Sequence, residues 1–422
     1  MSAILNQYLD SSEISSDDGP PTQYTSLQGQ KPSLTKTKKQ QNAAFRVTNK
    51  NLQCNYVVRG VGTKEYTIPE FLIEPNAFID KSTVLYGRSK TGKTVTTKDI
   101  MFNLQPYFPR VWVFAPTGEG THDYDGVAPK GAMFETVTLE QINDVFEHAK
   151  MAKAVYENAN NLKVLNKLFS RVASTKAKSH LKKMIDAFAQ TKKRLNRKIT
   201  APAPRRAAQL KVKDEFETGL RAFYKRVIEP NIQKLRLMRL NDKEKNSLHY
   251  LHFNPRTLVI FDDAMTEVAS LIKKGRQTNN EVVQNFFFKG RHYNITHIYT
   301  MQDDKKLDPA LRKNTFISMF TSKSEAVGYF NNKANAFTLE EKKCAESVID
   351  TIFYDGKPKD DHMRMCFIKD SKHKWMWYAA SFREPFPMGG TPFRELCSRL
   401  EAKNATFDKT NKFHDQFLGY AN

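Results

Sequence analysis

The chain has 422 residues, about three times a common domain length, so it is long enough for one enlarged domain with appendages or for two domains. With 40% hydrophobic residues and no apolar run near the ~20 residues that span a bilayer, its composition excludes a disordered polymer and a membrane-spanning protein. Lysine and arginine total 67 against 45 acidic residues, and the formal charge of +22 favours a polyanionic partner, either nucleic acid or an anionic membrane surface.

The first part of the chain has the composition of a disordered arm. Residues 1–45 begin rich in Ser, Asp and Gly, turn basic, and lack apolar periodicity. The N-terminus also lacks the apolar core of a secretory signal. The cysteines are spread without the paired spacing of a zinc site, which indicates a reducing, intracellular setting. They are Cys54, Cys344, Cys366 and Cys397.

Short apolar runs rich in β-branched and aromatic residues follow. A hairpin is expected over 54–68, and the next runs are TVLYG (83–87), VWVFA (111–115), TLVIF (257–261), ITHIYTM (295–301) and TFISMF (315–320). Helical stretches separate these runs, as in a sheet of buried parallel strands. RMCFIKD and KWMWYAA are predicted to form an antiparallel hairpin at the sheet edge. The fold class is therefore α/β: a mostly parallel sheet flanked by helices, with a C-terminal β-hairpin and no internal repeat.

About 140 residues separate the second and third of these strands, far more than a crossover requires, so we predict an insertion. Residues 151–250 contain 25 Lys or Arg and 8 Asp or Glu, and therefore carry +17 of the total +22. Apolar residues at helical spacing indicate a helical subdomain with a basic exterior. They are Phe216, Leu220, Phe223, Val227 and Ile228. A solvated cationic face without a ligand is the alternative, although ordinary exposed helices alternate charges.

Prolines divide this insertion. Pro230 is expected to end or kink the helix before it, and APAPRR (201–206) is expected to break any continuous helix, with part of the surrounding segment unordered. The expected domain organisation is an arm over 1–45, a core formed by 46–150 and 251–385, the basic insertion over 151–250, and a tail over 386–422.

A phosphate-binding loop lies between the first sheet strand and a helix, where the pattern G-x-x-x-x-G-K-[ST] is required to be. Its glycines let the backbone fold around phosphates, while amide N–H groups and the helix N-terminus supply positive potential. We expect Lys93 to contact the β- and γ-phosphates of ATP and the Thr94 hydroxyl to bind Mg²⁺. A chance match in a basic loop is the alternative. The predicted nucleotide-binding residues are Gly87, Arg88, Ser89, Lys90, Thr91, Gly92, Lys93 and Thr94.

A buried strand that ends in carboxylates completes such a site. TLVIF is followed by Asp262 and Asp263. We expect Asp262 to hold Mg²⁺, directly or through water, and Asp263 to polarise the attacking water as the catalytic base. The alternative is that the two aspartates only cap the following helix.

Two further catalytic groups are expected. Gln302 ends the strand ITHIYTM, at the sheet edge where ligands of open α/β sheets bind, so its amide is placed to sense the γ-phosphate and the lytic water. The alternative is a turn glutamine that faces solvent. An arginine finger can come from the same chain or a neighbour, and Arg88, Arg291 and Arg312 are the candidates. We favour Arg291 across a subunit boundary; any of the three can instead be a surface residue or a DNA contact.

The segments GRSKTGKT, TLVIFDDA, GRHYNITHIYTMQ and LRKN, in this order, resemble the genome-packaging ATPases of large eukaryotic DNA viruses, poxvirus-like members of the FtsK/HerA superfamily. The resemblance covers about residues 64–145 and 250–385, and not the arm or the insertion. It implies an ASCE/RecA-like P-loop fold in a homo-oligomeric ring, with double-stranded DNA and a capsid or portal vertex as partners. The implied location is the virion or an intracellular viral assembly site. The family's roles fall on Lys93, Thr94, Asp262, Asp263, Gln302 and Arg291.

The sequence departs from the family pattern at two places. Arg88 and Lys90 stand where many relatives have small residues, which resembles the basic loops of phage large terminases and leaves a same-chain finger open. Asp263 replaces a longer Glu, so its action as base requires an intervening water. The C-terminus shows no nuclease pattern of clustered carboxylates.

The leading hypothesis is an ATP-driven translocase that packages double-stranded viral DNA. One alternative is a helicase or recombination-type ATPase without a capsid. The other is a protein that binds ATP and nucleic acid without turnover.

Overall fold

The computed structural model describes residues 56–59, 65–117, 122–199, 201–278, 280–302, 307–353, 363–369, 371 and 373–402. The arm predicted over 1–45 and the last part of the predicted tail lie outside these residues. The described residues form two compact units, one built on a sheet and one that contains residues 154–253. No helix in the described part of the chain combines the length and apolar character needed to cross a membrane.

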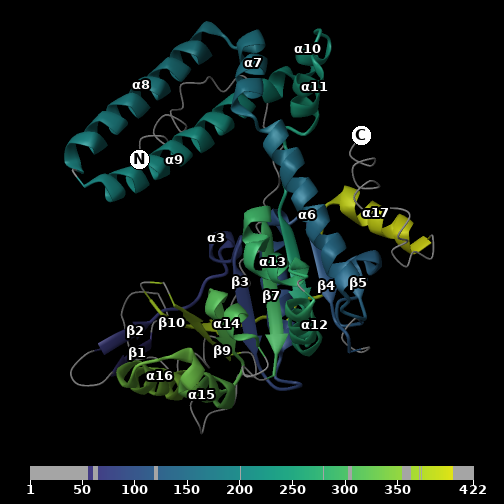
Figure 1. The fold of residues 1–422 in the computed structure, drawn as a ribbon, viewed down its shortest axis with the longest axis vertical. Helices are drawn as coiled ribbons and strands as arrows, with labels where there is room; N and C mark the ends of the chain where they lie inside the picture. The colour runs from purple at the N-terminus through teal and green to yellow at the C-terminus, as the bar shows by residue number, and fades with distance from the viewer. Residues whose placement is uncertain are drawn as a thin grey trace. The chain divides into compact units, whose positions relative to one another are not determined.

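Eight strands form the sheet of the first unit (Figure 1), in the order β10-β9-β8-β3-β7-β6-β4-β5. The strands from β8 to β5 run parallel, and β9 and β10 are antiparallel additions at one edge, as the sequence predicted. Their bounds are β3 (Ser82–Tyr86), β4 (Arg110–Phe114), β5 (Met133–Phe134), β6 (Thr257–Phe261), β7 (Ile295–Met301), β8 (Ile317–Phe320), β9 (Met363–Ile368) and β10 (Trp375–Ala379). The two-residue β5 was not predicted, and β8 begins two residues later than its run. A separate antiparallel hairpin joins β1 (Tyr56–Arg59) and β2 (Glu65–Ile68).

The central strands are buried over their full length, because helices cover the sheet. Phe286 and Phe287 of α13 pack on Phe261 of β6 and on His297 and Tyr299 of β7. The helices of this unit are α3 (Pro75–Phe78), α4 (Lys93–Leu104), α12 (Met265–Gln277), α13 (Val282–Lys289), α14 (Pro309–Asn314), α15 (Lys323–Asn331), α16 (Leu339–Ile352) and α17 (Thr391–Ala402). α6 (Leu139–Ala159) begins in the sheet unit and ends in the helical unit.

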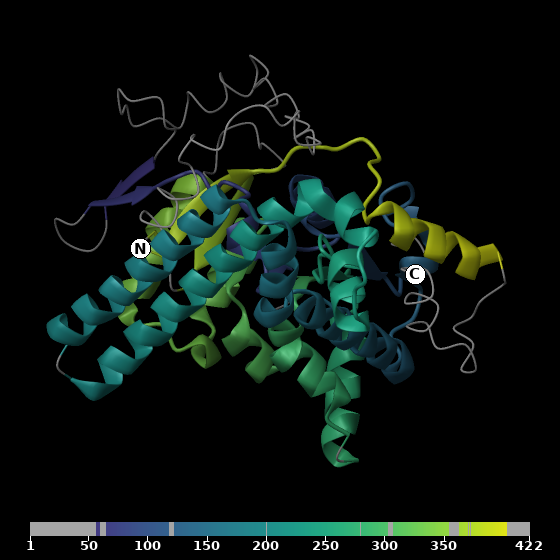
Figure 2. The same ribbon diagram turned by 90° about the horizontal axis from the view of Figure 1, so that it is seen from above.

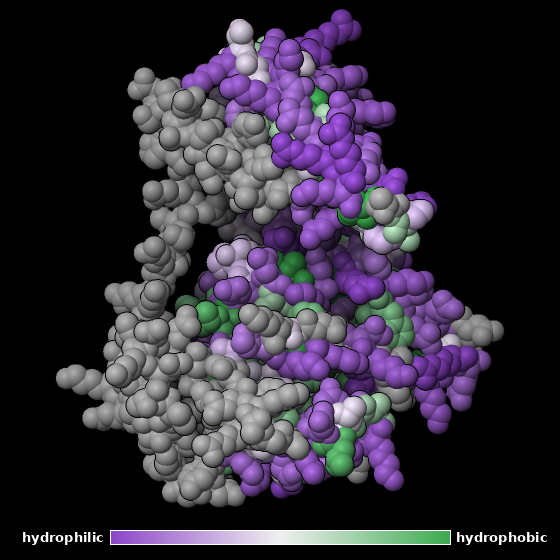
Figure 3. All heavy atoms as spheres, turned by 90° about the vertical axis from the view of Figure 1, so that its left-hand side faces the viewer, coloured by the Kyte–Doolittle hydropathy of each residue, from purple (hydrophilic) through white to green (hydrophobic). Residues whose placement is uncertain are grey.

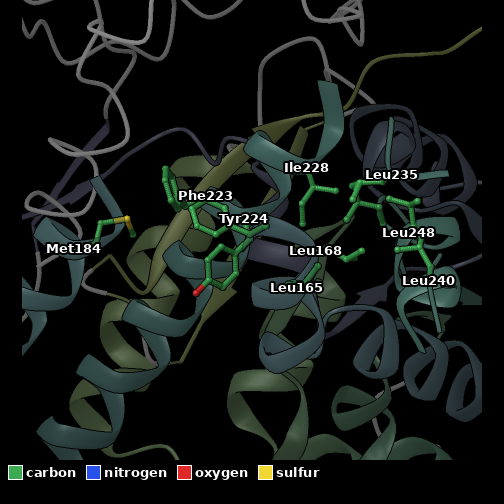
Figure 4. Packing of buried hydrophobic residues seen from close by; sticks show 11 residues of the cluster. Leu165, Leu168, Met184, Phe223, Tyr224, Ile228, Leu235, Leu240 and Leu248 are labelled. Atoms are coloured by element: carbon green, nitrogen blue, oxygen red, sulfur yellow. The ribbon is translucent and has the colours of Figure 1, made fainter. Parts of the chain in front are cut away.

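The second unit is helical, as expected. It contains α7 (Leu162–Val172), α8 (Thr175–Lys198), α9 (Pro202–Ile228), α10 (Ile232–Arg236) and α11 (Asp242–His249). The long helices α8 and α9 run side by side (Figures 1 and 2). Its core lies between α7, α9, α10 and α11, with Leu165, Leu168, Phe223 and Ile228 among its buried side chains (Figure 4). A single buried side chain of α8, Met184, joins this core, so most of α8 faces solvent.

One expectation about this unit needs correction: α8 and α9 cover most of residues 176–213, so the described part of this segment is helical rather than unordered. The expected interruption of a continuous helix at APAPRR is confirmed, because α8 ends at Lys198 and α9 begins at Pro202. Pro202 and Pro204 lie in the first turn of α9, where a backbone N–H has no partner within the helix and proline is tolerated. α9 ends at Ile228, two residues before Pro230, as predicted.

A candidate nucleotide-binding site

The loop between β3 and α4 has the backbone of a phosphate cradle. Gly92, the N-cap of α4, has φ 82°, and Lys90 has φ 63°, so the chain makes two left-handed turns before the helix starts. Gly87 is pressed against the end of β8, since a Cβ there would lie 2.1 Å from Oγ1 of Thr321. Its N–H donates to the carbonyl of Met301 at the end of β7 (2.9 Å). Glycine is therefore required at both ends of the loop.

Lys93 lies within the cradle that its own loop forms. Its Nζ donates to the carbonyls of Gly87 (2.9 Å) and Arg88 (3.2 Å), and it lies 3.3 Å from Oδ2 of Asp263. The side chain is only 6% exposed. These contacts fix an ammonium group in the concave side of the loop, which is the position needed to bind phosphate oxygens.

Two segments that are 168 residues apart meet at Asp262. The Thr94 hydroxyl lies 3.4 Å from Oδ2 of Asp262, which also accepts a hydrogen bond from the Tyr124 hydroxyl (2.8 Å). Thr300 donates to the other carboxylate oxygen. Burial raises the pKa of Asp262, while the hydrogen bonds from Thr300 and Tyr124 oppose that rise.

These residues fit a magnesium site. Neighbouring ligands of an octahedral Mg²⁺ lie roughly 3 Å apart, which is close to the separation of the Thr94 hydroxyl and the Asp262 carboxylate. Mg²⁺ in nucleotide sites takes one or two protein oxygens and completes its shell with phosphate and water. Among the described residues, no cluster of three His, Cys, Asp or Glu side chains is suited to a metal.

The capping role considered for the two aspartates is wrong. α12 begins after Ala264, its N-cap, and no side chain caps it. Asp263 instead has φ 49°, donates its N–H to the Thr300 hydroxyl (3.0 Å) and pairs with Lys93. A left-handed non-glycine residue is strained, and such strain gathers at functional sites. The backbone thus turns Asp263 toward the phosphate loop.

Gln302 follows β7 directly and is exposed. Its neighbour Met301 pairs with Tyr86 at the end of β3 and accepts the hydrogen bond from Gly87. The structure therefore places Gln302 beside the start of the phosphate loop. Its role as a sensor stays a prediction.

The three arginine candidates occupy different places. Arg88 is in the loop, where its Nε lies 3.2 Å from Oε1 of Glu325. Arg291 is exposed and precedes β7, whose seven residues at ~3.3 Å each put it roughly 20 Å from the loop end of that strand. Arg312 likewise precedes β8 and donates to the carbonyl of Leu307 (3.0 Å). Arg291 is thus too far from the phosphate loop of its own chain to act there, and its role at the site of a neighbouring subunit stays a prediction.

Several residues that build the site were not predicted from the sequence. Tyr124 lies in a loop without a pattern, and no local signal could have found it. Thr300 and Arg364 are polar residues inside apolar strands, and this pattern in the sequence could have marked them as residues of the site. Arg364 is fully buried and donates to the carbonyl of Gly92 (3.1 Å) and to the Thr96 hydroxyl (2.7 Å). Thr321 donates to the Thr91 hydroxyl (2.7 Å).

The strand order decides the fold class. β7 lies between the strand that leads into the phosphate loop, β3, and the strand that delivers the aspartates, β6. This inserted strand is the mark of the ASCE/RecA-like arrangement. The chain has an ASCE/RecA-like P-loop fold.

Comparison with known proteins gives viral relatives. No family model matches the chain. It is 29% identical over 367 residues to the uncharacterized protein B354L of African swine fever virus, covering 83% of this chain and 96% of B354L. It is also 29% identical over 173 residues to the uncharacterized protein L437 of Acanthamoeba polyphaga mimivirus, covering 38% of this chain and 55% of L437.

Solved structures give weaker likenesses. The conjugation coupling protein TcpA of pCW3 aligns with a TM-score of 0.33 and 11% identity over 78% of this chain and 66% of TcpA. VirB4 of Thermoanaerobacter pseudethanolicus aligns with a TM-score of 0.30 and 13% identity over 72% of this chain and 90% of VirB4. At such scores the strand order, rather than these alignments, establishes the fold.

Proposed function

We propose that the protein is an ATPase that moves double-stranded DNA and packages a viral genome into a capsid. The observation that carries the nucleotide half is the meeting of Thr94 and Asp262 at 3.4 Å beside Lys93. A phosphate loop alone binds anions, whereas a loop joined to a buried carboxylate can hold Mg²⁺ and a triphosphate together.

In this proposal, each residue has one task. The loop amides and Lys93 bind the phosphates, while Thr94 and Asp262 hold Mg²⁺, which neutralises charge on the phosphates when bound. Asp263 accepts a proton from the attacking water through a second water, because its side chain is short. Gln302 orients that water, and Arg291 of a neighbouring subunit in a homo-oligomeric ring stabilises charge on the γ-phosphate.

The proposal that the protein binds DNA is supported by the positive charge of α8. α8 carries nine Lys or Arg and one acidic residue, Asp186, so its cations have almost no acidic partners within the helix. The α8–α9 surface that faces the viewer in Figure 3 is mostly hydrophilic. Such a surface suits the phosphate backbone of DNA, which is bound without reading its sequence.

The capsid half rests on the resemblance to packaging ATPases and is supported by the viral relatives, whose names assign no activity. It implies a capsid or portal vertex as partner and a place in the virion or at an intracellular assembly site. Binding to such a vertex would distinguish a packaging ATPase from a helicase or recombination ATPase.

Hydrolysis of ATP by the purified full chain, with and without double-stranded DNA, tests the proposal. We expect DNA to stimulate hydrolysis and Lys93→Ala to lower the rate on the order of a hundredfold or more, because one preorganised cation at the phosphates is removed. Lys343→Ala, which changes an exposed lysine of α16, should leave the rate unchanged. Near-normal turnover in Lys93→Ala would contradict the site. No hydrolysis by the wild type across salt and oligomer conditions would favour a binding protein without turnover.

A further inference from the structure

Arg88 is held by an ion pair on one side of the phosphate loop. Its Nε lies 3.2 Å from Oε1 of Glu325, in the first turn of α15. α15 follows β8, whereas Asp262 and Asp263 follow β6. In the sheet, β8 and β6 lie on opposite sides of β3. The ion pair therefore directs Arg88 away from the two carboxylates of the nucleotide site.

The two side chains of this ion pair differ in how freely they can move. The Glu325 side chain is 7% exposed and accepts a hydrogen bond from the Ser322 hydroxyl, at a helix start that favours negative charge. The turn before it is tied to the cradle by Thr321, which donates to the Tyr86 carbonyl and to the Thr91 hydroxyl. The Arg88 side chain is 75% exposed. Glu325 is thus the fixed partner and Arg88 the movable one.

The strength of the Arg88–Glu325 ion pair limits how much it can oppose the binding of a triphosphate. An ion pair with so exposed a partner changes an equilibrium by about fivefold at most. A bound triphosphate presents several negative charges to a loop arginine, against one on the Glu325 carboxylate, and arginine binds phosphate in charge-assisted hydrogen bonds. The pair is therefore weak enough to open when a triphosphate enters the loop.

We propose that Glu325 is a positioning residue that keeps Arg88 off the site, and that the γ-phosphate of a nucleoside triphosphate takes Arg88 over from it. This inference rests on the proposed function, since it takes residues 87–94 as the nucleotide site. Glu325 then opposes triphosphate binding by the free energy of the ion pair, while Arg88 supports binding. A diphosphate, which lacks the γ-phosphate, leaves the pair intact.

The test measures the affinity of the full chain for a fluorescent nonhydrolysable ATP analogue with Mg²⁺, and for the matching ADP analogue. Glu325→Gln should tighten binding of the ATP analogue about threefold to fivefold and leave the ADP analogue unchanged. Arg88→Ala should weaken binding of the ATP analogue. Glu325→Gln should have no effect when added to Arg88→Ala, because the partner it releases is gone.

Two further variants serve as controls for this test. Glu340→Gln removes an exposed carboxylate from the first turn of α16 and should change neither affinity. Glu325→Asp keeps the charge but shortens the side chain, so it should act like Glu325→Gln and replaces it should that variant unfold in a thermal melt. Unchanged or weaker ATP-analogue binding in the folded Glu325 variants would overturn the inference. So would an equal gain for both analogues, or a gain that persists with Arg88→Ala. Failure of the wild type to bind either analogue would instead contradict the proposed function.

Discussion

Lys93 is the residue at which the phosphate loop and the aspartates converge. The loop motif predicted its place, and the position of Asp262 and Asp263 after an apolar strand predicted carboxylates at the metal and the attacking water. The ion pair between Lys93 and Asp263 was not predictable, because it depends on the left-handed backbone of Asp263. A motif specifies which residues meet, whereas the geometry of their meeting comes from neighbours such as Tyr124 and Thr300.

His297 gives a residue-scale prediction about pH. Burial among Phe286, Phe287 and Tyr299 lowers its pKa to about 3, from the ordinary value near 6.5. The folded state keeps this ring neutral, and the unfolded state binds a proton below pH 6.5. Because of this ring, the free energy of unfolding decreases by ~1.4 kcal/mol per pH unit as pH falls from about 6.5 to about 3. Urea unfolding of the wild type and His297→Leu across this range measures it.

The free energy of unfolding of His297→Leu should fall less steeply on acidification. The difference in slope from the wild type should correspond to one bound proton. His373→Leu, which replaces an exposed histidine, is the control and should follow the wild type. Equal slopes for the wild type and His297→Leu would show that His297 is not the group that titrates.

At the scale of elements, the runs of β-branched and aromatic residues were enough to predict the strands from β3 to β10 except β5. The run that became β7 was predicted to its last residue. The order of the strands was not predictable from these runs, because a buried strand is apolar on both faces and does not specify its neighbours. The place of β7 between β3 and β6, on which the fold class depends, needed the structure.

Strand β9 supplies a prediction for an element, because its buried Arg364 donates hydrogen bonds to the phosphate loop and to the helix that follows it. Arg364→Met should leave the Gly92 carbonyl and the Thr96 hydroxyl without this donor. We expect a loss of about 2–3 kcal/mol in the free energy of unfolding and weaker binding of a nonhydrolysable ATP analogue. Urea unfolding and fluorescence titration measure the two effects.

Lys369→Met is the matched control, since it changes an exposed cation directly after the same strand and should alter stability by less than about 0.5 kcal/mol. Wild-type affinity for the analogue in a folded Arg364→Met variant would show that β9 does not support the loop.

At the scale of the whole molecule, the sequence predicted a charged insertion within an α/β core, and the structure has a helical unit over residues 154–253. The excess of cations was readable from composition. The helical hairpin was not, because prolines at 202 and 204 indicate an interruption but do not show that the segments on both sides of it are helical. The boundaries given for the arm, core and tail stay predictions.

The cations of α8 give the prediction at this scale. Changing the exposed Lys182, Lys183, Lys192, Lys193 and Arg194 together to Gln should weaken binding to double-stranded DNA. Because each neutralised phosphate contributes about 0.9 to the slope of log affinity against log salt, that slope should become shallower by up to about 4.5. Fluorescence anisotropy at several salt concentrations measures it.

A control with five exposed lysines of the sheet unit changed to Gln alters the net charge equally. They are Lys273, Lys274, Lys313, Lys333 and Lys343. The control should keep most of the wild-type slope. A slope that is unchanged by the α8 substitutions, or reduced equally by both sets, would remove the DNA-binding role of α8.

The claim that ATP hydrolysis moves the protein along double-stranded DNA is tested most directly by displacement of a third strand from a triplex placed along a duplex. We expect the wild type with ATP and Mg²⁺ to displace the third strand. Neither Lys93→Ala with ATP nor the wild type with a nonhydrolysable analogue should displace it. Vigorous DNA-stimulated hydrolysis with no displacement at any triplex position would contradict it.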